Sequence, residues 1–211
     1  MTLRGCWDCM RFAIKNTQIE LSFWFAFVVC FLLTCSDNTV IQLTVLFSLL
    51  HECGHLLSDC RFGVHPQIIR FGLFGMTIVR AADLRLSYRQ EICTALAGPS
   101  VNLFFCLLFL GLYCKKNDML FLQCGVVNLY IFAFNAMPVF SLDGGRALEA
   151  FLQSRLQNEN RILTVQKVVS LLCISVVMCF GFIILFSSKR NFTLLLLSVY
   201  LIFALFQKCG T

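Results

Sequence analysis

Long segments without charge dominate this chain and limit what it can fold into. One of them, residues 40–50, reads VIQLTVLFSLL and holds no ionisable side chain. The 211 residues are 59% hydrophobic and 13% charged, whereas soluble domains carry about 25% charged residues. Inside a bilayer, only helices and closed barrels satisfy their own backbone hydrogen bonds. The composition therefore predicts an integral membrane protein in a lipid bilayer and excludes a soluble globular domain.

Six apolar segments are candidates for transmembrane helices, which need about 20 residues to cross the hydrocarbon core. They are residues 19–35, 39–58, 91–114, 119–136, 162–186 and 192–206. The first follows basic residues, as the core of a signal peptide does. The polar stretch after it does not resemble a cleavage site, so we interpret the segment as a span. The predicted fold class is an all-α polytopic membrane protein with one domain over residues 1–211.

Residues 66–80, between the second and third spans, have a different composition. They are rich in β-branched and aromatic residues, carry two arginines and are too short to span a membrane. A strand pair that turns around Gly72 to Gly75 fits this pattern. An interfacial loop is the alternative. We therefore expect a small β-hairpin or sheet beside the helices.

Basic residues flank the apolar runs and form no patch, although the net charge is +6. We therefore predict no nucleic-acid partner and interpret these residues as topology signals. If the N-terminus lies inside the cell, the basic residues of the non-cytoplasmic segments are only Lys115, Lys116, Lys189 and Arg190. This bias predicts that both termini lie in the cytoplasm. It also places the end of the second span near the cytoplasmic face.

The thirteen cysteines do not form a disulfide pattern. Their number is odd, and most lie within apolar runs, where cysteine behaves as a small, soft apolar residue. Cys6 and Cys9 form a CxxC pair, but no second pair follows that would complete a zinc ribbon. We therefore favour a terminus without a metal or redox role for these two cysteines.

The second span ends in the sequence His51-Glu52-Cys53-Gly54-His55. An ionisable side chain at the centre of a membrane helix costs about 2.5–3.5 kcal/mol on insertion scales, so three together need a reason. Residues four apart on a helix differ by about 40° around its axis, so both imidazoles share a face and can bind zinc. The adjacent carboxylate can then activate a water molecule. The alternative is a polar helix end that faces the lipid headgroups.

Asp143 is the candidate third ligand, because a catalytic zinc site takes three protein ligands and leaves one position open. Pro138 breaks the chain as it leaves the fourth span, and Gly144-Gly145 permits a sharp backbone path beside the carboxylate. The alternative role of Asp143 is an N-cap for a short helix that follows. Other candidates are weaker, because Glu91, Glu149 and Glu159 lie at the charged edges of spans and Cys53 points about 200° away from His51.

Asn102 lies in a second unusual string within a span, Ala97-Gly98-Pro99-Ser100-Val101-Asn102. A buried amide needs a hydrogen-bond partner. Two interpretations stay open: a hydrogen bond between helices, and the positioning of substrate or water near the metal.

These strings resemble the site-2 protease family of intramembrane metalloproteases. His51 to His55 matches the HExxH of the family, and Asn135 to Gly144 resembles its NxxPxxxxDG element. The Ala-Gly-Pro-x-x-Asn string is typical of bacterial members, and the compact plan resembles the branch with the sporulation protease that processes a membrane-associated pro-sigma factor. The resemblance extends over about residues 20–186. Ser141 stands where many relatives have proline, and we expect no PDZ-like or nucleotide-sensing domain.

The resemblance implies a zinc endopeptidase with one Zn²⁺ per chain, held by His51, His55 and Asp143. It implies Glu52 as the general base, and Asn102 and Asn135 as groups that position the substrate or the oxyanion. The expected substrate is a membrane-embedded or membrane-associated regulator, such as a pro-sigma or anti-sigma factor, cut near the cytoplasmic face of a bacterial cell membrane. An oligomer is compatible with this plan. An unwound substrate could pair with the strand edge at residues 66–80.

Two other classes are alternatives to the site-2 protease interpretation. A non-catalytic membrane metal-binding or transport protein needs the metal ligands but not Glu52. A prenyl-protein protease with HExxH in its membrane helices would be expected to use a downstream glutamate as its third ligand.

Overall fold

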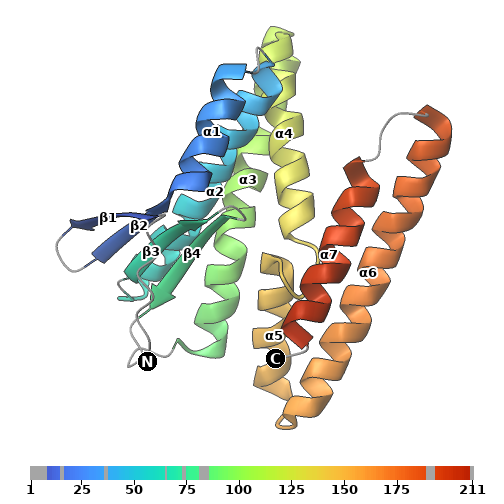
Figure 1. Ribbon diagram of the computed structural model, residues 1–211. Helices are drawn as coiled ribbons and strands as arrows, with labels where there is room; N and C mark the ends of the chain where they lie inside the picture. Colours follow the sequence, from blue (N-terminus) through green and yellow to red (C-terminus); the bar gives the residue numbers. More distant parts are fainter. Residues whose placement is uncertain are drawn as a thin grey trace. The chain divides into compact units, whose positions relative to one another are not determined.

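Helices make up most of the chain, beside one small sheet (Figure 1). The computed structural model describes residues 9–14, 17–35, 38–64, 66–72, 75–80, 86–188 and 193–209. The strands in these ranges are β1 (Cys9–Ile14), β2 (Thr17–Ser22), β3 (Pro66–Gly72) and β4 (Gly75–Arg80). The helices are α1 (Phe23–Cys35), α2 (Thr39–Arg61), α3 (Tyr88–Lys116), α4 (Met119–Asn135), α5 (Asp143–Arg155), α6 (Glu159–Ser188) and α7 (Thr193–Cys209).

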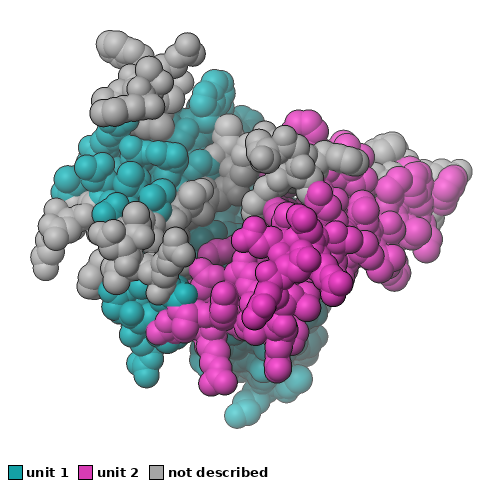
Figure 2. Space-filling view, turned by 90° about the horizontal axis from the view of Figure 1, so that it is seen from below, with its two compact units in different colours: residues 1–86, 100–131 teal, residues 87–99, 132–211 magenta. Residues whose placement is uncertain are grey.

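The chain divides into two compact units, which are coloured separately in Figure 2. Unit 1 comprises residues 1–86 and 100–131, and unit 2 comprises residues 87–99 and 132–211. Helices α3 and α4 each contribute residues to both units. The two units are described one at a time below.

Three helices in the described residues are long and apolar enough to cross a membrane: α2, α3 and residues 159–186 of α6. Apolar helices of 10–17 residues occur in α1 and α4. The mostly helical membrane fold is therefore confirmed, while the count of six spans stays a prediction.

The predicted start of the first span was wrong, because α1 begins at Phe23 and not at residue 19. The preceding residues, TQIELS, form β2, and polar and apolar side chains alternate over residues 18–22. This alternation has the period of a strand that is buried on one face.

The sheet has the strand order β1-β2-β3-β4 (Figure 1). β1 pairs with β2 and β3 pairs with β4 in antiparallel fashion, whereas β2 and β3 are parallel. A parallel pair needs a long crossover connection, which α1 and α2 supply here.

The predicted strand pair at residues 66–80 is confirmed, but its turn residues 73 and 74 lie outside the described residues. Of the CxxC pair, Cys9 begins β1 and Cys6 lies outside the described residues.

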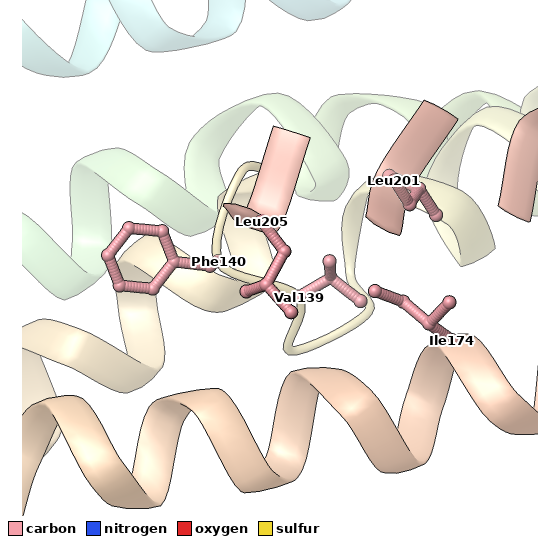
Figure 3. Packing of buried hydrophobic residues seen from close by; sticks show 5 residues of the cluster. All are labelled: Val139, Phe140, Ile174, Leu201 and Leu205. Atoms are coloured by element: carbon pink, nitrogen blue, oxygen red, sulfur yellow. The ribbon is translucent and has the colours of Figure 1, made fainter. Parts of the chain in front are cut away.

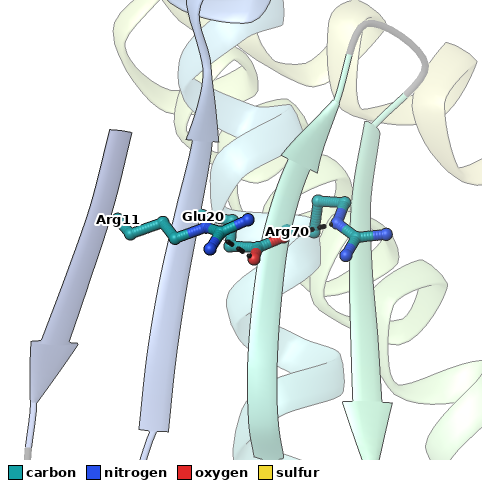
Figure 4. A network of polar contacts seen from close by, with 3 residues as sticks. All are labelled: Arg11, Glu20 and Arg70. Atoms are coloured by element: carbon teal, nitrogen blue, oxygen red, sulfur yellow. Dashed lines mark hydrogen bonds and ion pairs between the residues drawn. The ribbon is translucent and has the colours of Figure 1, made fainter. Parts of the chain in front are cut away.

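A carboxylate joins three strands of the sheet (Figure 4). Glu20 of β2 lies directly opposite Arg11 of β1 and Arg70 of β3 in the strand register. Nε of Arg70 lies 2.8 Å from Oε2 of Glu20, and Nε of Arg11 lies 3.3 Å from Oε1. Glu20 is only 7% exposed. The two guanidinium groups therefore compensate a buried charge that would be costly if it were unpaired.

Aromatic packing fixes α2 within unit 1. The ring of Phe47 on α2 lies 5.6 Å from that of Phe105 and 5.7 Å from that of Phe109, both on α3. Phe47 also belongs to a buried cluster with Cys124 and Val127 of α4. This cluster lies one helical turn before His51, so it holds the start of the HExxH motif against α3 and α4.

Unit 2 has its own core, which surrounds the connection between α4 and α5 (Figure 3). Val139 and Phe140 of this connection pack with Ile174 of α6 and with Leu201 and Leu205 of α7. All five side chains are buried. The segment that leads to Asp143 is therefore anchored by hydrophobic contacts rather than lying free at the surface.

Candidate metal centre

Two buried histidines on one face of α2 form the centre of the site. His51 and His55 are each 4% exposed, and their Nε2 atoms lie 3.2 Å apart. Two nitrogens that bind one tetrahedral zinc ion at about 2.0–2.1 Å would lie about 3.3 Å apart. The spacing of the two imidazoles therefore fits a shared zinc ion.

A chain of amide hydrogen bonds in unit 1 sets the tautomer of His51. Nδ2 of Asn128 donates to the carbonyl oxygen of Cys124 at 2.8 Å, which leaves Oδ1 of Asn128 as an acceptor. Nδ2 of Asn102 donates to that Oδ1 at 3.0 Å and to the carbonyl oxygen of Phe47 at 3.4 Å. Oδ1 of Asn102 then faces Nδ1 of His51 at 2.6 Å.

The direction of this chain follows from the backbone carbonyls, which can only accept hydrogen bonds. Oδ1 of Asn102 accepts, so Nδ1 of His51 must carry the proton and donate it. Nε2 of His51 then presents a lone pair. Metal-binding histidines are commonly oriented by such a bond from their other ring nitrogen. Asn102 therefore holds His51 in the tautomer that a metal ligand through Nε2 requires.

Asn128 was not predicted from the sequence. It lies in the middle of α4 and is fully buried, as is Asn102. The available signal was a second amide inside an apolar helix, since buried polar groups need partners. Sequence reasoning applied that rule to Asn102 but not to Asn128.

Glu52 is half-buried and lies about 100° around α2 from His51. It lines a pocket of about 180 Å³ in unit 1, together with residues of α1 and β3 that include Val29 and Phe71. Cys53 is exposed.

Asp143 is the first residue of α5, in unit 2. The N-cap position belongs to Leu142, which makes no side-chain cap hydrogen bond, so the alternative role of Asp143 as N-cap is wrong. The Asp143 side chain is 14% exposed, and its Oδ1 lies 3.9 Å from Nη1 of Arg146.

Two glycines follow Asp143 because the backbone is too crowded for side chains. A Cβ at Gly144 would collide with the carbonyl oxygen of Ala136, and a Cβ at Gly145 would collide with that of Val139. The helix α5 therefore starts in direct contact with the connection that precedes it.

Helix α6 supports this connection with two polar side chains. Nε2 of Gln166 donates to the carbonyl oxygen of Gly145 at 3.1 Å, and the backbone N–H of Phe140 donates to Oγ of Ser170 at 3.0 Å. Both side chains are fully buried. Sequence reasoning missed them, although two polar residues at a spacing of four within an apolar helix were a usable signal.

The predicted site residues thus fall into two groups. Unit 1 brings His51, His55 and Asn102 together, with Glu52 beside them. Unit 2 holds Asp143 and Asn135, the last residue of α4. Two histidines and one aspartate supply the donor types that a catalytic zinc ion takes.

The fold is that of a solved site-2 protease from Methanocaldococcus jannaschii. The two structures superpose with a TM-score of 0.63 over 94% of each chain, at 23% sequence identity. No family model matches the chain. These findings confirm the resemblance to the site-2 protease family at the level of the fold.

Two curated proteins are similar in sequence. A Synechocystis protein whose name assigns it to the zinc metalloproteases is 29% identical over 119 residues, which are 53% of this chain and 30% of that protein. A zinc metalloprotease of Methanocaldococcus jannaschii is 27% identical over 158 residues, 68% of this chain and 45% of that protein. The chain matches less than half the length of each relative. With its apolar helices and its fold, it is an integral membrane protein.

Proposed function

We propose that this protein is an intramembrane zinc metalloendopeptidase. The observation that carries the proposal is the pair of buried imidazoles with Nε2 atoms 3.2 Å apart, next to the carboxylate-bearing Glu52. The likeness to two proteins named as zinc metalloproteases supports the choice of metal and reaction. A non-catalytic metal-binding or transport protein would have no use for Glu52 on the adjoining face of α2.

We propose His51, His55 and Asp143 as the three zinc ligands. A bound zinc ion polarises a carbonyl oxygen and lowers the pKa of a coordinated water molecule. Neutral imidazoles and a carboxylate match its preference for nitrogen and oxygen ligands. The low exposure of the Asp143 side chain and the anchored connection before it support this assignment, because a catalytic ligand must be held in place.

Glu52 is the proposed general base. It accepts the proton of the attacking water and returns it to the amine of the leaving peptide segment. The proposed role of Asn102 is indirect: it accepts a hydrogen bond from Nδ1 of His51, which keeps the Nε2 lone pair available for the metal. Both N–H groups of the Asn102 amide already have acceptors, which disfavours a direct bond to an oxyanion. Asn135 stays a candidate for substrate positioning.

The proposed substrate is a transmembrane or membrane-associated regulatory protein, such as a pro-sigma or anti-sigma factor, cut near the cytoplasmic face. This choice rests on the family resemblance and on the charge bias. A helical substrate must unwind before its peptide bonds become accessible. In the described part of the sheet, β4 pairs only with β3, so its outer edge can accept such a segment as an added strand.

The proposed arrangement has six membrane spans and both termini in the cytoplasm. The shortest proposed span is α1, with 13 residues. The six proposed spans are α1, α2, α3, α4, α6 and α7. A bacterial cell membrane is the proposed location.

Co-expression with candidate single-span substrates tests the proposal. Wild-type protein should release a clipped product, and Glu52→Gln should release none while it still binds zinc. Equal cleavage by both proteins would contradict the role of Glu52. Zinc content of purified Asp143→Ala tests the third ligand separately, and full zinc occupancy in that variant would exclude Asp143.

A further inference from the structure

A small pocket in unit 1 lies beside Glu52, between α1, α2 and β3. Its volume is about 180 Å³. Among its lining residues are Phe25 and Val29 of α1, Phe71 of β3, and Thr44, Ser48 and Glu52 of α2. Thr44 and Ser48 lie on the same side of α2 as the histidines, and Glu52 lies about 60–100° further around the helix axis.

Most of the side chains that line the pocket are apolar, and the polar ones are those of Thr44, Ser48 and Glu52. The rings of Phe25 and Phe71 lie 5.5 Å apart and form an aromatic wall. The hydroxyl of Thr44 donates to the carbonyl oxygen of Val40 at 2.7 Å, so this hydroxyl is engaged with its own helix. Among the described residues that line the pocket, Glu52 is the only charged one.

The volume fits one side chain rather than a whole ligand. Pockets for drug-sized ligands measure about 300–1,000 Å³, whereas an apolar cavity of about 150 Å³ binds benzene. A leucine or phenylalanine side chain therefore matches the size and the chemistry of this pocket.

We propose that the pocket binds a large apolar side chain of the substrate, from a residue that flanks the scissile peptide bond. The proposal rests on the proposed function of Glu52 as general base. A base must lie within hydrogen-bond reach of the water that attacks the peptide carbonyl. The side chains next to that carbonyl then lie within a few ångströms of Glu52, where the pocket begins.

The carboxylate also favours a peptide over a lipid acyl chain as the occupant. A hydrocarbon chain offers no hydrogen-bond donor to a carboxylate. An unwound peptide brings backbone N–H groups and water into the same space. The pocket therefore selects a peptide segment with an apolar side chain at this position.

Filling the pocket from α1 tests the proposal. Val29→Phe adds a ring at the lining, and Val28→Phe is the matched control, because Val28 is exposed and does not line the pocket. Both variants and the wild type are assayed on single-span substrates that carry alanine, leucine or phenylalanine beside the cleavage site. Wild type and Val28→Phe should prefer leucine and phenylalanine over alanine by about tenfold or more. Val29→Phe should lose this preference while it still cuts the alanine substrate.

A uniform change across the three substrates, or no change, in Val29→Phe would overturn the proposal. It would mean that lipid or protein fills the pocket. A second measurement does not depend on cleavage: a substrate with a photoreactive phenylalanine beside the cleavage site is bound to Glu52→Gln and irradiated. Crosslinks to Phe25, Val29 or Phe71 are expected. Crosslinks without cleavage by the wild type would refute the protease function but keep the pocket, and their absence would refute the pocket.

Discussion

In the proposed zinc site, the tautomer of His51 decides whether its Nε2 atom can act as a ligand. It is set by amide groups on two other helices, Asn102 on α3 and Asn128 on α4. Neither amide has to touch the metal or the substrate to matter. Removing a partner of a metal-binding histidine typically weakens metal affinity by about 10–100-fold.

Asn102→Ala should therefore lower zinc affinity by about 10–100-fold, as measured by competition with a chromogenic chelator. Asn128→Ala should weaken zinc binding less, because it removes only the support of Asn102. Asn160→Ala, at an exposed site on α6, is the matched control and should bind zinc like the wild type. Zinc affinity unchanged in Asn102→Ala would refute the positioning role.

The glycine pair after Asp143 gives a second prediction about single residues. Gly145→Ala should destabilise the protein by about 1–3 kcal/mol, because its Cβ meets the backbone of Val139. Thermal unfolding in detergent measures this loss. Gly111→Ala in α3 is the control, since a Cβ there meets nothing within 4 Å. Equal stability of the two variants would show that the connection can move.

At the scale of single residues, the sequence predicted the candidates that carry their own chemistry and one supporting amide, Asn102, but it missed other supporting residues. His51, Glu52, His55 and Asp143 could be predicted as candidates because ionisable groups are rare in apolar runs. Gln166 and Ser170 support a backbone segment far away in the sequence. Their partners are main-chain atoms, whose positions depend on the fold and are not visible in the residue pattern.

Among the elements, the sheet is the part where prediction from the sequence was least complete. The pair β3 and β4 could be predicted from local composition, but β2 was assigned to the first span. Its alternation of polar and apolar residues covers only residues 18–22, and the apolar α1 follows directly. A charged residue within it, Glu20, becomes acceptable only through Arg11 and Arg70, which come from other strands.

The edge of β4 yields a prediction about substrate binding. Along an antiparallel edge strand, successive residues point their N–H groups alternately toward the partner strand and away from it. Of Thr77→Pro and Ile78→Pro, one should therefore remove a bond to β3 and the other an N–H at the free edge. The edge variant should keep wild-type thermal stability and lose cleavage of a single-span substrate. A stable edge variant with normal cleavage would rule out strand addition at β4.

The whole molecule is proposed to cross the membrane six times, although three helices in the described residues meet the length and hydropathy required. The helices α1 and α4 are shorter, and short spans are accommodated by local thinning of the bilayer. Length and composition of single helices therefore do not determine the topology, but the distribution of basic residues predicts it.

Reporter fusions test this topology. A reporter enzyme that is active only outside the cytoplasm should be active when fused after Asn117, between α3 and α4. It should be inactive when fused after Asn158, between α5 and α6. A cytoplasmic fluorescent reporter should give the opposite pattern. The same activity at both sites would contradict the proposed orientation.

Hydrolysis by purified protein in liposomes tests the central claim most directly. A single-span substrate is incubated in water enriched in oxygen-18, and the products are analysed by mass spectrometry. We predict that wild type places one heavy oxygen in the new carboxyl terminus, that removing the metal with a chelator stops the reaction, and that zinc restores it. Cleavage at the wild-type rate by Glu52→Gln, or cleavage that continues after complete removal of metal, would contradict the account.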